Sequence, residues 1–122
     1  MNESKGSSVL KRIEAAKGRK VLPMHEFLAE SDPETLDAFD RFLTCSIYRD
    51  DGLPESIKEM LLACVCVTAG SSQPVIANHC RKALAAGLER DLLVQALEIT
   101  AAVMATRTLA IGINSVIDAE NS

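Results

Sequence analysis

Apolar residues recur along most of this chain at the three- and four-residue spacing of amphipathic helices, and no stretch alternates as a strand does. The first helix is predicted from Val9, Leu10, Ile13 and Ala16 and ends near Gly18. A short connecting stretch, 21–28, follows it. A second helix is predicted over 33–48, where Ser31 or Asp32 serves as cap and Pro33 fits the first turn. Its predicted buried stripe is made of Leu36, Phe39, Phe42, Leu43 and Ile47.

A third helix begins near Pro54, is polar for one turn and becomes apolar on all sides over Met60–Val67. Because an all-round apolar helix is usually buried, this one is predicted to be the central element. The turn residues of 70–74 separate it from a fourth helix ending at Gly87. A fifth helix follows from 89, and the periodic segment 109–117 either continues it or follows a bend near 106–108. The pattern predicts an all-α, single-domain helical bundle of about five to six helices.

Composition favours association with further copies of the chain. In 122 residues, 48% are hydrophobic but only 3% are aromatic, so Ala, Leu, Val and Ile must form the core. These side chains bury little area each, at roughly 25 cal/mol per Å² of apolar surface. A small Ala-rich subunit of this kind is expected to gain stability as a homo-oligomer.

Charge is unevenly distributed. Residues 1–20 hold six Lys or Arg against two Glu, and residues 21–60 hold ten acids against three bases. No aromatic residue interleaves the basic run, and the net charge is −4, so nucleic-acid binding is not expected. The division predicted from this is a peripheral, solvated basic segment, 1–20, followed by a helical domain, 21–122.

The cysteines and the apolar runs indicate a cytoplasmic, soluble protein. Cys45, Cys64, Cys66 and Cys80 lack the spacing of a disulfide framework, and the charged first twenty residues are unlike a signal peptide. The longest apolar run is far shorter than the ~20 residues that a membrane span needs. No ligand spacing indicates a metal site, and no cofactor is expected.

His79 is the most informative single residue. It shares a helix face with Ile76 and Ala83 and is therefore predicted to point inward, where an imidazole can serve as general acid or base. The alternative is a core histidine whose nitrogens are satisfied by neighbouring groups. Glu59 shares a face with Leu62, Ala63 and Cys66, so it either pairs with an inward base or is a surface residue at the helix end.

Arg107 and the cysteines complete the candidates. Arg107 is the only charged residue between Glu98 and Asp118, so it is a candidate for binding a substrate carboxylate, or else for an interface salt bridge. The side chains of Cys64 and Cys66 diverge by about 200° around a helix and cannot form a relaxed disulfide. These two and Cys80 are therefore interpreted mainly as buried free thiols, with a redox role as the alternative.

The order of these features resembles the carboxymuconolactone decarboxylase and alkylhydroperoxidase D superfamily. Residues 53–63 are similar to its Leu-Pro … Lys-Glu-Leu entry into the central helix, and 79–88 to its His-x-x-x-Ala-x-x-x-Gly block. Residues 89–104 resemble the helix that follows that block, and 34–43 with 51–54 fit the layout upstream. The resemblance covers roughly residues 20–118.

The resemblance implies an all-α subunit that assembles as a trimer or hexamer and acts on a small molecule. It implies a decarboxylase-type lyase with His79 as general acid/base, Glu59 orienting it, and a carboxylated or lactone-like substrate. The redox cysteine pair of the alkylhydroperoxidase D branch is replaced here by Ser72 and Val75, so dithiol chemistry cannot proceed as in that branch. The acid of the decarboxylase branch is also missing at Val75.

Two further functions remain open from the sequence. One is a thiol antioxidant that uses Cys80 with Cys64 or Cys66. The other is a catalytically idle scaffold or binding subunit.

Overall fold

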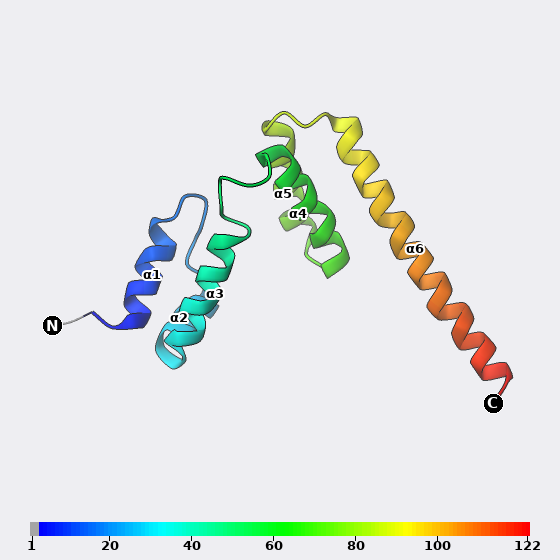
Figure 1. Ribbon diagram of the computed structural model, residues 1–122, viewed down its shortest axis with the longest axis horizontal. Coiled ribbons are helices and arrows are strands. Elements are labelled where there is room, and N and C mark those ends of the chain that lie inside the picture. The colour runs from blue at the N-terminus through cyan, green and yellow to red at the C-terminus, as the bar shows by residue number, and fades with distance from the viewer. Residues whose placement is uncertain (1–2) are drawn as a thin grey trace. The chain divides into compact units, whose positions relative to one another are not determined.

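The computed structural model describes residues 3–122 and is helical throughout that range, with no strand in it (Figure 1). The six helices are α1 (Lys5–Ala15), α2 (Pro23–Ser31), α3 (Pro33–Cys45), α4 (Glu55–Ala69), α5 (Gln73–Ala85) and α6 (Arg90–Glu120). The all-α prediction and the number of helices are therefore confirmed. The chain forms two compact units, of which unit 1 ends at Gly52 and unit 2 is Leu53–Ser122.

Unit 1 packs α1, α2 and α3 pairwise around a very small core. Val9, Ile13 and Leu36 are 2%, 0% and 0% exposed, and half-buried side chains such as Leu10 and Leu28 surround them. At Gly6 the backbones of α1 and α2 touch, because a Cβ built there would lie 1.9 Å from the carbonyl oxygen of Ala29. Only glycine allows this helix crossing.

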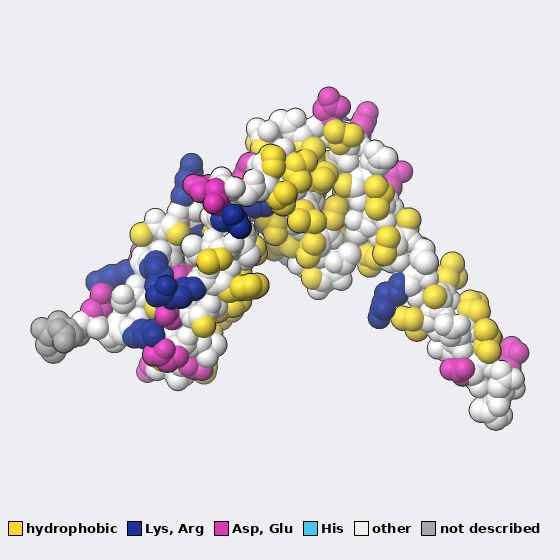
Figure 2. All heavy atoms as spheres, viewed as in Figure 1, with side chains coloured by type: hydrophobic (Ala, Val, Ile, Leu, Met, Phe, Trp, Pro, Cys, Tyr) yellow, Lys and Arg dark blue, Asp and Glu magenta, His cyan; other side chains and the backbone are white. Residues whose placement is uncertain are grey.

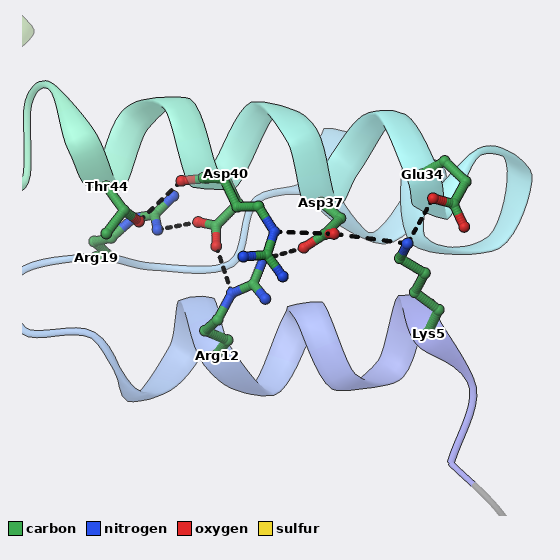
Figure 3. A network of polar contacts seen from close by, with 8 residues as sticks. Lys5, Arg12, Arg19, Glu34, Asp37, Asp40 and Thr44 are labelled. Carbon is green, nitrogen blue, oxygen red and sulfur yellow. Dashed lines mark hydrogen bonds and ion pairs between the residues drawn. The ribbon is translucent and has the colours of Figure 1, made fainter.

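A network of ion pairs joins α1 to α3 (Figure 3). Asp40 is 1% exposed and accepts hydrogen bonds from Arg12 Nε (2.7 Å) and from Arg19 Nη1, whose side chain is 6% exposed. Arg12 Nη2 also donates to Asp37 at 2.5 Å, and Lys5 Nζ donates to Glu34 at 2.5 Å. The guanidinium of Arg19 lies 4.4 Å from the ring centre of Tyr48. The network satisfies a carboxylate that would otherwise be buried without a partner.

Two predictions for the region before α3 are corrected. Residues 1–20 are not peripheral as a whole, because Arg12 and Arg19 bind the acids of α3 and because Val9 and Ile13 form the core. The side chains of Lys11, Lys17 and Lys20 are exposed, as expected. The stretch 21–28 contains most of helix α2 rather than a connection.

Phe42 is 68% exposed and Phe39 is 39% exposed, so the predicted buried stripe of α3 is wrong at both positions. Phe42 points about 120° away from Leu36 around the helix. The buried position between Leu36 and Leu43 belongs to Asp40, because the arginines of the N-terminal segment compensate its charge.

Unit 2 begins with a hairpin of α4 and α5, and α6 packs against both helices. Gly70 ends α4 in the left-handed conformation (φ 80°), and the N–H of Ser71 donates to the carbonyl of Cys66 at 2.9 Å. This short turn, 70–72, folds α5 back along α4. Ala63, Ala83 and Leu93 are the buried apolar residues of the unit, one from each helix.

The surface of unit 2 is unusually apolar, as the yellow side chains over α4–α6 in Figure 2 show. Leu61 and Val65 are each 50% exposed, so the all-round apolar part of α4 is not buried within unit 2, contrary to the prediction. The exposed large side chains of α6 include Ile99, Val103, Leu109, Ile113 and Val116.

Helix α6 runs without a break through residues 106–108, which settles the choice left open by the sequence. It is 31 residues long, with a mean hydropathy of 1.4 over its most apolar 18-residue window, and none of that window is buried. By length and composition it could therefore span a membrane, although core helices of soluble assemblies have the same composition.

Candidate functional site

The hairpin of α4 and α5 brings Glu59 and His79 together. Glu59 lies at the end of the polar first turn of α4, and His79 lies in the middle of α5. Ala63 is one turn beyond Glu59, and Ala83 is one turn beyond His79; both are 0% exposed. These small side chains allow the two helices to approach closely, so a carboxylate and an imidazole twenty residues apart in sequence can meet.

The contact between them is short and shielded. Glu59 Oε2 lies 2.7 Å from His79 Nδ1, and the two side chains are 6% and 19% exposed. An ionised carboxylate only accepts hydrogen bonds, so Nδ1 carries the proton in this contact. A hydrogen bond of this kind fixes both the ring orientation and the tautomer of the histidine.

The second ring nitrogen of His79 is available for chemistry. Within residues 3–122, Nε2 has no hydrogen-bond partner, and no fully buried side-chain nitrogen or oxygen lacks one. Nε2 must therefore be in contact with solvent. When Nδ1 is held by Glu59, Nε2 can accept a proton from a bound molecule or, after protonation, return it.

A separate apolar groove of about 280 Å³ lies between α4 and α6. Its lining includes Cys64 and Val65 from α4, and Ile99, Val103 and Met104 from α6. Neither His79 nor Glu59 lines this groove. A larger depression on unit 1, of about 410 Å³, is lined by Lys5, Arg12 and Asp37, which are already engaged in ion pairs.

Arg107 and Glu98 do not join the pair. Both are exposed on α6, and neither makes an ion pair within the described part of the chain. The structure of one chain thus places a shielded acid–base pair on α4 and α5 and leaves the predicted carboxylate-binding arginine elsewhere on the unit.

The four cysteines are free thiols. Cys64, Cys66 and Cys80 are half-buried, whereas Cys45 is exposed. Cys64 lines the apolar groove, and Cys80 follows His79 directly in α5. No group of three or more His, Cys, Asp or Glu in residues 3–122 is arranged to hold a metal ion.

His25 shows what a structural histidine looks like in the same chain. It is 5% exposed, and its Nδ1 accepts a hydrogen bond from the backbone N–H of Leu22 at 2.9 Å, at the start of its own helix. Sequence reasoning did not identify this role, nor the burial of Asp40. An acid inside an apolar stripe was the visible signal for Asp40, but its partner Arg19 is 21 residues away.

No family model matches the chain, and no curated protein or solved structure matches it. The chemistry of the Glu59–His79 pair is therefore inferred from its own geometry and from the motif resemblance described above.

Proposed function

We propose that this chain is a carboxymuconolactone decarboxylase-like enzyme that acts on a small carboxylated or lactone-like substrate, with His79 as general acid/base. The observation that supports this most is the 2.7 Å contact between His79 Nδ1 and the buried Glu59 carboxylate. It holds the imidazole in one tautomer and leaves Nε2 facing solvent. Catalytic histidines are commonly oriented in this way by a carboxylate.

The reaction that suits the pair is the loss of CO₂ next to an electron-accepting group. The bond between the substrate carbon and its carboxylate breaks, CO₂ leaves, and the electron pair remains on the substrate as an enolate. Protonated Nε2 of His79 then donates its proton to the carbon. Glu59 stabilises the imidazolium before this step, and solvent restores the proton afterwards.

Arg107 is proposed to bind the anionic group of the substrate, and the functional form is proposed to be a homo-oligomer, a trimer or hexamer. Within one chain Arg107 makes no polar contact with His79 or Glu59. Its role therefore depends on a second copy of the chain. Guanidinium groups bind carboxylates through two parallel hydrogen bonds, so one arginine is enough to orient such a substrate.

The test is CO₂ release from a panel of carboxylated lactones, measured for the wild type and for three variants. His79→Gln is expected to lose 10²- to 10⁴-fold in turnover, the usual contribution of a positioned acid or base. Glu59→Gln is expected to lose about 10- to 100-fold, because it removes the orienting partner. Glu98→Gln removes an exposed carboxylate of the same type and is expected to have no effect.

The ¹⁵N chemical shifts of the His79 ring report its tautomer and provide a second test that needs no substrate. The wild type is expected to show a proton fixed on Nδ1, and Glu59→Gln to show a mixture of tautomers. Turnover that survives in His79→Gln would rule out the proposal. Intact tautomer fixation without any turnover on the panel would favour the scaffold or binding subunit.

A further inference from the structure

Helix α6 carries a heptad stripe that the other helices of unit 2, α4 and α5, leave largely exposed. The stripe consists of Leu92, Ala96, Ile99, Val103, Thr106, Ala110, Ile113 and Ile117, at alternating spacings of four and three residues. About half to two-thirds of each large side chain in it is exposed, from 49% at Leu92 and Ile117 to 64% at Val103. A repeat of this period is typical of a helix that packs against another helix along its whole length.

The stripe lies beside the surface that α6 uses within unit 2 and overlaps it at Ile99 and Val103. The neighbouring row, Leu93, Thr100 and Arg107, repeats every seven residues along one edge of the stripe. Leu93 is buried, and Thr100 lines the groove with α4, so the first half of this edge faces the rest of the unit, whereas Arg107 is exposed. Ile99 and Val103 belong both to the stripe and to the groove wall, so a helix lying on the stripe would also contact α4.

The length of α6 shows that its own unit cannot cover it. At 1.5 Å per residue, α6 is roughly 46 Å long, whereas α4 with 15 residues and α5 with 13 are about 20 Å long. The α4 side of the groove is opposite residues 99–104, close to the end of α4. The remainder of α6, which includes Ile113 and Ile117, extends past α4 with its apolar stripe exposed.

We propose that the stripe binds the same stripe of a second copy of the chain, with the two α6 helices antiparallel. One register uses all eight positions: Leu92 opposite Ile117, Ala96 opposite Ile113, Ile99 opposite Ala110, and Val103 opposite Thr106 of the second copy. Each alanine then meets an isoleucine, which is the alternation of large and small side chains that fills a helix interface. A parallel pair would set alanine against alanine at two layers and leave voids.

The footprint of the stripe alone is about half of the roughly 800 Å² that a stable interface buries per partner, so the flanking side chains must contribute as well. A stripe of 26 positions is about 39 Å long and about 10 Å wide, which is a footprint of roughly 390 Å² per helix before side-chain relief is counted. Exposed Leu109 and Val116 on one edge and Val65 of α4 on the other widen it. Stable interfaces bury about 800 Å² of accessible surface per partner.

The polar residues of α6 argue for a protein partner rather than a lipid one. In a membrane Arg107 would lie near the middle of the span, where a charged side chain is costly to insert. Thr100, Arg107, Asn114 and Asp118 share one side of the helix, away from the centre of the stripe. A paired helix leaves this side out of the apolar contact, whereas lipid would surround it.

The pairing also gives Arg107 a new neighbour. In an antiparallel pair the edges that carry Leu93, Thr100 and Arg107 face each other. Arg107 of the second copy then comes level with Ala102, between Thr100 and Met104 on the wall of the α4–α6 groove. The guanidinium of one chain would thus stand at the α4–α6 groove of the other, which Glu59 and His79 do not line. The pairing does not depend on the proposed chemistry of His79.

The test compares two isoleucines of the same helix. Ile113 is on the stripe and 55% exposed, and Ile111 is off the stripe and 50% exposed. In sedimentation equilibrium, Ile113→Glu is expected to weaken self-association at least tenfold, and Ile111→Glu to leave it within twofold of the wild type. Circular dichroism of both variants verifies that the helices are retained.

The register is tested by oxidative cross-linking of mixed variants. A mixture of Val103→Cys and Thr106→Cys chains is expected to give a disulfide between residues 103 and 106 of different copies, identified by mass spectrometry of the linked peptide. Either variant alone is expected to give much less. A parallel pair would instead link residue 103 to residue 103.

Three results would overturn the proposal: a wild type that stays monomeric at 100 µM in about 0.15 M salt, equal loss of association in both isoleucine variants, or a cross-link between identical positions. Binding of the wild type to vesicles of phosphatidylcholine and phosphatidylglycerol, weakened equally by both variants, would assign α6 to lipid. Loss of turnover in His79→Gln with association intact would separate the two proposals.

Discussion

The two units of this chain both have few aromatic residues and small apolar cores, but they differ in what else stabilises them. Unit 1 buries only Val9, Ile13 and Leu36 as its core and adds a buried carboxylate held by two arginines. Unit 2 has the more apolar helices but buries only Ala63, Ala83 and Leu93 among its apolar residues. Apolar composition thus shows how much surface a helix needs covered. It does not show that its own chain covers it.

The largest effect on stability is expected from a substitution at Gly6, where α1 and α2 of unit 1 approach most closely. Gly6→Ala places a Cβ within 1.9 Å of the Ala29 carbonyl oxygen, and both atoms belong to backbone-bound groups that cannot rotate away. We expect unit 1 to lose about 3 kcal/mol or more of stability, at the upper end of overpacking effects. Hydrogen exchange at the amides of Val9 and Ile13 measures the loss. Unchanged protection at both amides would contradict the helix crossing.

A somewhat smaller effect is expected from Asp40→Asn. The substitution leaves the buried guanidinium of Arg19 without a charged partner, which typically costs about 3 kcal/mol in a buried pair. Thermal unfolding followed by circular dichroism should show the loss in the part of the chain that contains α1–α3. Asp51→Asn is the matched control, because Asp51 pairs with Arg49 while 74% exposed, and it is expected to leave the melting temperature unchanged.

A smaller effect is expected from acid, which should destabilise unit 1 because its ion pairs depend on ionised Asp37 and Asp40. The Arg12 hydrogen bond, followed by that of Arg41, lowers the pKa of Asp37 to about 2. Burial tends to raise the pKa of Asp40, but the hydrogen bonds of Arg19 and Arg12 outweigh it, and the net pKa is lowered. A lowered pKa stabilises the folded state fully above the unfolded value of about 3.9.

That stabilisation is lost as pH falls from about 4 through the folded values. Between pH 6 and pH 2.5 we therefore expect protection of α1 amides to decrease in hydrogen exchange, and Asp37→Asn to show a smaller decrease. Equal protection of the wild type at both pH values would contradict the role assigned to the network.

The smallest effect is expected from a glycine-to-alanine substitution in α6, at Gly112. A Cβ at Gly112 meets nothing within 4 Å, and the position is off the heptad stripe. Gly112→Ala is expected to stabilise the helix by about 0.5–1 kcal/mol, because alanine loses less backbone entropy than glycine. A rise in the helical signal at high temperature would show it. A destabilised α6 would mean that another surface covers this position.

The sequence predicted five of the six helices, all except α2, because the three- and four-residue spacing of apolar positions is a local property. It also put His79 on an inward face, but it left Glu59 open between pairing with an inward base and lying on the surface at the helix end. The short turn at 70–72 brings the two side chains into contact. Phe42 was misplaced because burial in α3 depends on Asp40, whose partners Arg12 and Arg19 are 28 and 21 residues away. The exposed stripe of α6 follows from helix length relative to α4, which needs the folded structure.

The turn between α4 and α5 also makes the contact between Glu59 and His79 local in sequence. The pair of Glu59 and His79 is closed by a local hairpin, and loops of this size close in about 10–100 ns. Contacts of such low sequence separation form early in folding. The contact between Glu59 and His79 therefore uses residues of the α4–α5 hairpin alone and needs none from α6. The acid–base pair is thus a local product of one hairpin, whereas the surface proposed to bind a second copy belongs to the last helix of the chain.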